Sequence, residues 1–193
     1  MSKYKVKPLS PEGLKTYSLR SRKDKVGIKD FARPLPAEKS FKRWVRSLPE
    51  VLAGRDFREF ISAMAEAKKK KKVILFALGA HVVKVGLNPI IIDLMKEGWI
   101  TALAMNGAGV IHDFEIAFAG KTSEDVELQV QEGKFGMAQE TGEIVNEAIN
   151  SSEKEGLGLG EAVARMIANS DFPYKDASLL CAAYKLNIPI TVH

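Results

Sequence analysis

The sequence predicts an α/β protein with a parallel sheet, and three short apolar segments are the main evidence. Residues 73–78 and 99–105 have the length and the apolar character of buried strands. Residues 188–192 are predicted to form a third strand, with Pro189 near its start. Segments with helical spacing lie between them. Strands that alternate with helices in this way are typical of a parallel sheet with crossover helices.

The first strand and its crossover helix occupy residues 73–98. A loop from Gly79 to Gly86 follows the strand, and then Asn88 is predicted to cap a helix with Pro89 at its first helical position. Gly98 ends that helix, and the second strand comes next. This is the expected length of a βαβ unit, so strands 73–78 and 99–105 should be parallel neighbours.

The second strand leads into a tight glycine turn. Gly107 and Gly109 lie one residue apart, and glycine is needed where φ is positive or where a ligand approaches the backbone closely. A helix from Ile111 to Ala119 is predicted next, with amides at its N-terminus that favour an anion. Three titratable side chains fall in its first turn: His112, Asp113 and Glu115. The pattern indicates an anionic ligand beside an acid–base cluster, or simply a strand-to-helix connection with an acidic first turn.

Two features of the C-terminal part have structural explanations. The glycines at 156, 158 and 160 follow no predicted strand, which argues against a dinucleotide-binding fingerprint. Cys181 is the only cysteine and lies in an apolar run, so we expect a buried side chain and no disulfide within the chain.

Charge is unevenly distributed along the chain. Residues 1–72 contain 21 Lys and Arg against 8 Asp and Glu, whereas residues 73–193 contain 8 against 16. Residues 1–39 are basic and rich in proline and are expected to form an extended arm, and residues 40–193 to form the α/β domain. Within the latter, Ser40 should cap a short helix, and Asp56 with Glu59 resembles a capping box that opens a second helix. That second helix runs into five lysines, 68–72, which are expected to stay in water.

The same charges bear on partners and location. No aromatic-rich nucleic-acid module accompanies the basic arm, so the arm is expected to lie on an acidic surface of this chain or of a partner subunit rather than on nucleic acid. The N-terminus lacks the apolar segment of a secretory signal, and no apolar run reaches membrane-spanning length. A cytoplasmic location without membrane contact is therefore expected.

The three histidines each fall just beyond a predicted strand. His81 follows the first, His112 the second and His193 the third. Ligands of open parallel sheets bind outside the carboxyl ends of the strands, so these side chains indicate a pocket there. Two chemistries fit: acid–base work by His112 and its neighbours beside a cofactor, or a transition metal held by the three histidines and a carboxylate, as in a metal-dependent hydrolase. No metal-binding spacing supports the second.

Three motifs carry a family resemblance. They are Phe76–Leu87 (FALGAHVVKVGL), Asn106–Asp113 (NGAGVIHD) and Asn187–Val192 (NIPITV). In their order and spacing they resemble the N-terminal half of the deoxyhypusine synthase-like family, over roughly residues 41–193. The resemblance implies a Rossmann-like NAD-binding fold and a tetramer with active sites between subunits. It also implies NAD-dependent transfer of an aminobutyl group from a polyamine, or related amine chemistry.

The resemblance also implies site residues. Gly79, Ala80, His81 and Val82 match the family's first NAD-contacting segment, and Asn106, Gly107 and Ala108 match its second. His112 stands where the synthases have a polyamine-binding glutamate, and Asp113 matches a family aspartate, so both are expected to face the substrate and to serve in catalysis. The change from glutamate to histidine removes an acceptor for a cationic amine and indicates a divergent paralogue with another substrate.

The family's later half has no counterpart in these 193 residues. That half supplies the catalytic lysine, so we expect a homo-oligomer, a tetramer by analogy, or a companion chain that completes the site. The alternative is a non-catalytic nucleotide-binding or oligomerisation module of the same fold. An isolated half would expose a sheet edge and an apolar face.

Overall fold

The computed structural model describes residues 12–15, 18–34 and 40–193. The chain divides into two compact units, residues 1–61 and 62–193. The extended conformation expected for the basic arm falls partly outside the described residues, at 1–11, 16–17 and 35–39. No helix in the described ranges has both the length and the apolar character that a membrane crossing requires.

The first unit consists of short helical segments. Its elements are η1 (Leu19–Ser21), η2 (Ile28–Asp30), α1 (Phe41–Ser47) and the first part of α2 (Leu52–Lys69). The predicted cap is confirmed, because the Ser40 side chain accepts a hydrogen bond from the backbone N–H of Arg43. The predicted start of the second helix is wrong: α2 begins at Leu52, where φ is +47°, and Asp56 lies one turn inside it.

Arg58 connects α2 to the end of α1. Its guanidinium donates to the backbone carbonyls of Leu48 at 3.0 Å and Pro49 at 3.3 Å, just beyond the last turn of α1. Carbonyls at a helix C-terminus lack intrahelical donors, and a cation there also opposes the negative end of the helix dipole. No residue in the described part of the first unit is buried, so no apolar core joins these helices. The Arg58 side chain instead holds α1 and α2 together through these hydrogen bonds.

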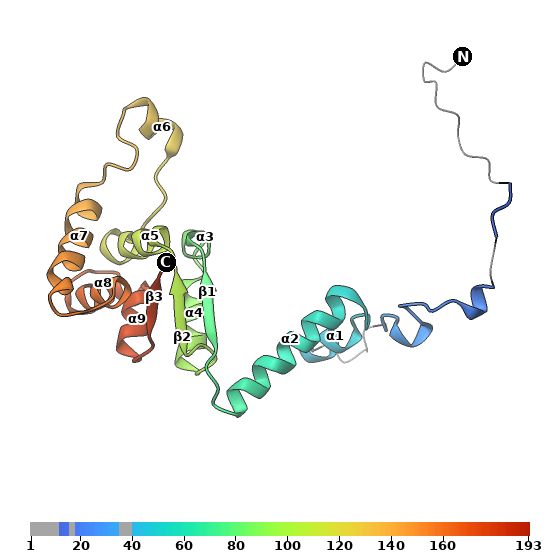
Figure 1. Ribbon diagram of the computed structural model, residues 1–193. Helices are drawn as coiled ribbons and strands as arrows, with labels where there is room; N and C mark the ends of the chain where they lie inside the picture. The colour runs from blue at the N-terminus through green and yellow to red at the C-terminus, as the bar shows by residue number, and fades with distance from the viewer. Residues whose placement is uncertain (1–11, 16–17, 35–39) are drawn as a thin grey trace, which may run out of the picture. The chain divides into compact units, whose positions relative to one another are not determined.

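The second unit is built on a three-stranded parallel sheet (Figure 1). The strands are β1 (Leu75–Leu78), β2 (Ala102–Met105) and β3 (Ile190–Val192), in the order β1-β2-β3. Leu75 pairs with Ala102, and Leu103 pairs with Ile190. The predicted α/β class and the parallel pairing of the first two strands are confirmed, although each strand is shorter than its apolar run.

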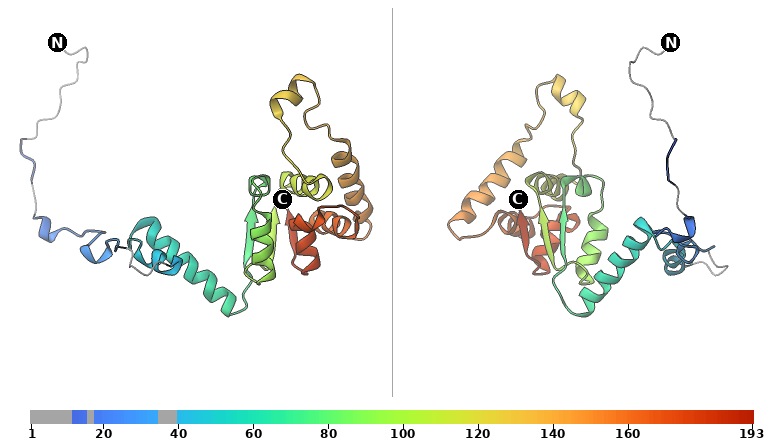
Figure 2. Two further views of the ribbon diagram at one scale, coloured as in Figure 1. Left: turned by 180° about the vertical axis from the view of Figure 1, so that it is seen from behind. Right: turned by 45° about the vertical axis from the view of Figure 1, so that its right-hand side comes forward.

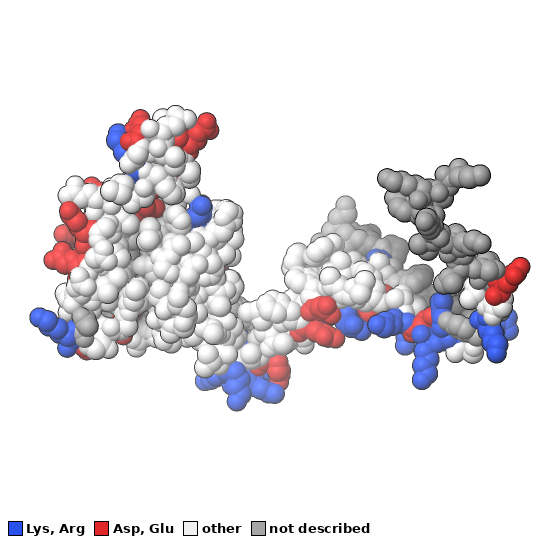
Figure 3. All heavy atoms as spheres, turned by 45° about the horizontal axis from the view of Figure 1, so that its top comes forward, with Lys and Arg blue, Asp and Glu red and all other residues white. Residues whose placement is uncertain are grey.

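Helices connect and cover the sheet (Figures 1 and 2). The helices of this unit are α3 (Ala80–Lys84), α4 (Asn88–Lys96), α5 (Gly107–Ala119), α6 (Val126–Gln131), α7 (Gln139–Glu153), α8 (Leu159–Asn169), η3 (Lys175–Ala177) and α9 (Leu179–Lys185). Both figures show α6 standing out from the sheet at the tip of two connections that lead back to α5 and α7. Acidic side chains cover the outer face of α7, where Glu140, Glu143 and Glu147 are exposed (Figure 3).

The core lies between the sheet and α4, α5, α8 and α9. Leu103 on β2, Val163 on α8 and Leu179 on α9 are fully buried. Phe114 packs on Phe118 and meets Phe172 edge-on, with ring centroids 5.7 and 5.8 Å apart respectively. Burial of such side chains provides most of the stability of the unit.

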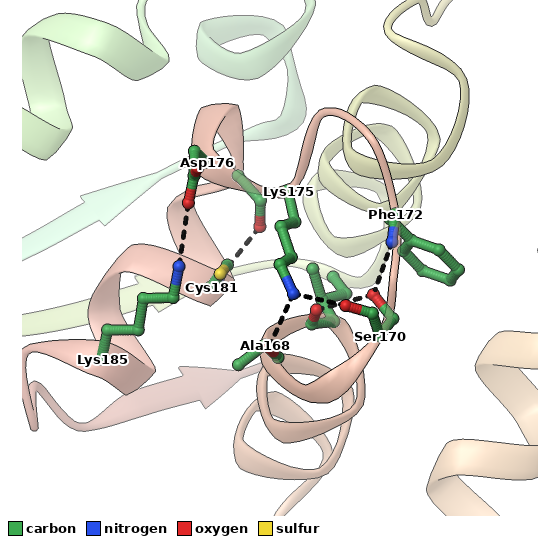
Figure 4. Close-up of polar contacts among 9 residues, drawn as sticks. Ala168, Ser170, Phe172, Lys175, Asp176, Cys181 and Lys185 are labelled. Carbon is green, nitrogen blue, oxygen red and sulfur yellow. Dashed lines mark hydrogen bonds and ion pairs between the residues drawn. The ribbon is translucent and has the colours of Figure 1, made fainter.

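The segment between α8 and α9 is held by polar contacts (Figure 4). The Lys175 ammonium donates to the backbone carbonyls of Ala168 and Ser170 at the end of α8. Lys185 on α9 forms an ion pair of 2.8 Å with Asp176. The Cys181 side chain is buried and unbonded to another sulfur, as its apolar surroundings predict, and its backbone N–H donates to the Ser178 hydroxyl.

Candidate functional site

The predicted cofactor residues lie at the carboxyl edge of the sheet. β1 runs through Gly79 into α3, and β2 runs through Asn106 into α5. The two helices pack side by side, so the two segments are neighbours at this edge (Figure 1). The first segment is Gly79, Ala80, His81 and Val82, and the second is Asn106, Gly107 and Ala108. A loop is expected from Gly79 to Gly86, and this expectation is wrong for Ala80–Lys84, which forms the short helix α3.

The glycine turn after β2 is in fact the first turn of α5. The Asn106 side chain caps the helix by accepting from the N–H of Gly109 at 2.9 Å, so α5 begins at Gly107, four residues before the predicted start. Neither Gly107 nor Gly109 adopts a positive φ. The prediction that the turn needs glycine for its backbone conformation is therefore wrong. The second reason remains for Gly107 but not for Gly109, which is buried and where an added Cβ would lie 3.5 Å from Asn106 and Met105. A Cβ added at Gly107, or at Gly79 after β1, would meet nothing within 4 Å. The backbone at both positions faces open space.

His112 belongs to a hydrogen-bonded cluster on the side of α5. Its Nδ1 lies 2.6 Å from the Thr122 hydroxyl and 3.3 Å from Oε2 of Glu115, and the Thr122 hydroxyl donates to the same Oε2. The His112 and Glu115 side chains are 19% and 25% exposed. Because α5 starts early, both residues lie beyond its first turn, which contains no acidic residue, and the predicted first-turn position is wrong.

Thr122 is the member of this cluster that the sequence does not reveal. In the sequence Thr122 precedes a helical segment, where Thr122 or Ser123 could serve as the cap, but α6 is capped by Asp125. Gly120 ends α5 with φ +69°, a conformation that favours glycine, and so reverses the chain toward α5. This reversal brings Thr122 back to side chains seven and ten residues earlier.

Asp113 lies in the core, away from His112 and its partners. Its carboxylate is fully buried and accepts four hydrogen bonds, from Asn88 Nδ2 (3.0 Å), the Ser178 hydroxyl (2.6 Å) and the backbone N–H groups of Leu179 (2.8 Å) and Leu180 (3.0 Å). Burial raises the pKa of Asp113 and outweighs these four bonds, which lower it. The structure thus places Asp113 at the N-terminus of α9, and not facing a substrate as expected.

Asn88 also serves this buried junction and is not a helix cap. It is the first residue of α4, with Leu87 at the cap position, so the predicted cap is off by one residue. Its Nδ2 donates to Asp113 and to the backbone carbonyl of Ala177 at 2.9 Å. Asn88 therefore links the start of α4 to α5 and to the turn before α9.

A cavity of about 410 Å³ adjoins the cluster. It lies between α5, the segment around α6, and α7, and its lining includes Ile111, His112, Glu115, Glu124, Thr141 and Lys84. Its volume is in the range of small-molecule sites, which combine an apolar wall with a few polar groups. None of the predicted cofactor residues lines this cavity. Ile111, which does line it, lies one helical turn after Gly107 on α5 and so relates the cavity to the open backbone at the sheet edge.

The three histidines do not form a metal site. His81 is exposed on α3, and His193 places Nε2 3.0 Å from the Thr191 hydroxyl. Within residues 12–15, 18–34 and 40–193, no three side chains of His, Cys, Asp or Glu are grouped so that they could hold a metal ion. The convergence that the metal interpretation requires is absent from this part of the chain.

Comparison with known proteins gives only distant structural similarity. No family model matches the sequence, and no curated protein matches it. ArgZ, an arginine dihydrolase from the ornithine-ammonia cycle in cyanobacteria, matches 74% of this chain with a TM-score of 0.46 and 19% identity. A conserved LOR/SDH protein from Methanococcus maripaludis S2 matches 93% with a TM-score of 0.45 and 17% identity. The chain spans 18% and 47% of the lengths of these two proteins.

Proposed function

We propose that residues 62–193 bind NAD at the carboxyl edge of the sheet and take part in amine chemistry of the deoxyhypusine synthase type. The single observation that carries this is the exposed backbone of Gly79 and Gly107, which follow neighbouring parallel strands and both face open space. Open sheets of this kind bind ligands at this edge. The motifs shared with the family are an independent reason to choose NAD.

The residues present fit a dinucleotide. The first amides of α5, at Gly107 and Ala108, have no acceptor inside the helix, and they carry the positive end of its dipole. Asn106 fixes this turn through its cap and leaves the backbone exposed. Bound NAD would supply hydride acceptance from an amine-bearing carbon. His112, in the adjoining cavity, would then exchange a proton with the substrate.

Aminobutyl transfer from a polyamine is the finer form of the proposal. It requires an acceptor lysine and further side chains, which the family places in its later half, so we propose that copies of this chain or a companion chain supply them. The alternative, a nucleotide-binding or oligomerisation module without catalysis, shares the NAD site and lacks turnover.

The substitution N106D tests the cofactor site without removing the helix cap. An aspartate oxygen can accept from the N–H of Gly109 as asparagine does, so α5 should keep its start. The added negative charge faces the position proposed for the pyrophosphate and should weaken NAD binding about tenfold or more, measured by isothermal titration calorimetry of the full chain. If the wild type and N106D bind NAD equally well, the proposed position of the cofactor is wrong. If the wild type does not bind NAD, the proposal of NAD as cofactor is refuted.

S40D is the matched control for N106D. Ser40 also caps a helix through its side chain, but it lies in the other unit. The same change from a neutral cap to a charged one should leave NAD affinity unchanged there. A loss in both variants would point to the total charge of the chain and not to a local site.

A further inference from the structure

The hydrogen bonds of His112 fix which of its ring nitrogens carries the proton. A carboxylate has no proton to donate, so the short contact between Thr122 and Glu115 uses the only hydroxyl proton of Thr122. The Thr122 oxygen can then only accept from His112 Nδ1, 2.6 Å away. Oε2 of Glu115, 3.3 Å from the same nitrogen, is also an acceptor. Both neighbours therefore require Nδ1 to be the N–H.

The opposite nitrogen is then free to accept a proton. In a neutral imidazole with its hydrogen on Nδ1, Nε2 carries a lone pair. His112 lines the cavity between α5 and α7. A histidine that is oriented through one nitrogen and faces a small-molecule cavity has the arrangement of a general base with its orienting groups.

Two carboxylates and one cation, Lys84, line this cavity, and the excess of negative charge favours a cationic partner. The titratable side chains in its lining are Lys84, His112, Glu115 and Glu124. Glu124 already accepts from the backbone N–H of Gly136 at 2.9 Å through one oxygen. Apolar side chains, including Ile111, Phe135 and Val145, complete the wall. An ammonium group on a short aliphatic chain matches this combination of carboxylates and apolar surface.

We propose that Thr122 and Glu115 are positioning residues that hold His112 as the Nδ1–H tautomer, with Nε2 as the proton acceptor for an ammonium group in the cavity. One N–H bond of the ammonium breaks, its proton bonds to Nε2, and the electron pair stays on the amine nitrogen. The imidazolium that forms is stabilised by Glu115, directly and through Thr122. This inference rests on the proposed amine chemistry and adds to it the residues that set the proton transfer. It changes the expectation that His112 removes an acceptor for an amine, because Nε2 is itself an acceptor and Glu115 and Glu124 supply carboxylates to the same cavity.

The tautomer can be measured without any ligand. The chain has only three histidines, so the imidazole ¹⁵N spectrum of the full protein is simple, and H112Q identifies the signals of His112. At a pH where histidine is neutral, we expect a protonated-type shift for Nδ1 and a lone-pair shift for Nε2. T122V, and separately E115M, should raise the fraction of the other tautomer. A mixture of tautomers for His112 in the wild type would overturn the proposal.

Two substitutions in the same cavity serve as controls. T141V removes a threonine hydroxyl from the lining, and E124Q removes a carboxylate charge, but neither residue bonds His112. Both variants should keep the wild-type tautomer of His112. A change in these variants as large as that in T122V would assign the effect to the cavity as a whole and refute the specific roles of Thr122 and Glu115.

The proton acceptor is then tested with n-butylammonium chloride as the probe. Titration into the wild type should give a saturable change in the His112 Nε2 signal, because the lone pair on Nε2 accepts a hydrogen bond from the ammonium group, and this change should be reduced at least severalfold in T122V and E115M. No shift in the wild type would overturn the proposal. The result does not depend on NAD, so calorimetry that finds no NAD binding would refute the proposed cofactor alone.

Discussion

At the scale of single residues, two neighbours on α5 have different tasks. Asp113 organises the protein interior, whereas His112 faces a cavity with Thr122 and Glu115. Sequence spacing predicts that both are functional but cannot separate them. The partners of Asp113 at the start of α9 are 65 to 67 residues away. Thr122 becomes a partner of His112 only because the chain reverses after Gly120. A local sequence pattern therefore predicts neither the partners of Asp113 nor the contact between Thr122 and His112.

The substitution D113N should destabilise the protein strongly. The new amide nitrogen would face donors, at Leu180 and Ser178 or at Leu179 and Asn88, in place of an acceptor. Leaving a buried donor without its acceptor costs about 1–3 kcal/mol. Urea unfolding measures this loss in the free energy of unfolding. D125N is the matched control, because Asp125 accepts from a backbone N–H at the start of α6 but is exposed, and its effect should be much smaller.

Asp113 also predicts a direction for the pH dependence of stability. Because its pKa is raised in the folded protein, the folded state keeps this proton at pH values where the unfolded chain has lost it. The stability that the protonated Asp113 contributes is therefore fully present below the ordinary aspartate pKa. It is lost as the pH rises through the pKa of Asp113 in the folded protein. The free energy of unfolding of the wild type and of D113N should be compared across the acidic pH range. As the pH rises, the wild type should lose stability relative to the variant. A difference that grows with pH in this range would contradict the prediction.

At the scale of elements, the sequence predicts which elements exist better than where they begin. The apolar runs predict the three strands and the class of fold. Burial on both faces is confirmed only for β2, because Leu75 and Ala77 on β1 and Thr191 on β3 are exposed.

Helix starts depend on which side chain reaches which amide. Asn106 caps α5 and Asp125 caps α6, while Asn88 is drawn into the buried junction with Asp113, and such choices depend on tertiary contacts.

The three glycines at the start of α8 illustrate a structural use of a motif that resembles a ligand site. Gly156 has φ +72°, Gly158 is the cap position of α8, and Gly160 lies against β3. A Cβ at Gly160 would lie 2.8 Å from the backbone oxygen of Ile190. The sequence prediction that these glycines are not a dinucleotide fingerprint agrees with this close packing of helix on strand.

The substitution G160A should therefore separate α8 from β3 and cost about 1–3 kcal/mol, as overpacking does. G142A is the control, since Gly142 also lies in a helix and a Cβ there would meet nothing within 4 Å. Alanine is about 1 kcal/mol better than glycine inside a helix, so G142A should stabilise the protein. Thermal unfolding of both variants measures the contrast, and equal shifts would refute the role of the contact with β3.

At the scale of the whole molecule, the first unit provides a reason for assembly. No residue of its described part is buried, and Phe41, Trp44 and Phe60 are 71%, 43% and 60% exposed. Phe41 and Trp44 lie next to each other on α1, with ring centroids 5.4 Å apart. Exposed apolar groups of this size are typical of an interface with another chain. Together with the basic character of residues 1–72, they favour a partner with an acidic surface.

We therefore expect the purified chain to associate at micromolar concentration. Sedimentation should give a mass well above the 21.2 kDa of one chain, because the aromatic side chains of the first unit gain most from leaving water. W44S and F60S should shift the population toward the single chain. M137S, which removes a still more exposed apolar side chain (75%) in the second unit, should not. Added salt should weaken an association that depends on the basic residues. A single species with the mass of one chain in the wild type would contradict the expected homo-oligomer. A companion chain would then be the partner to seek.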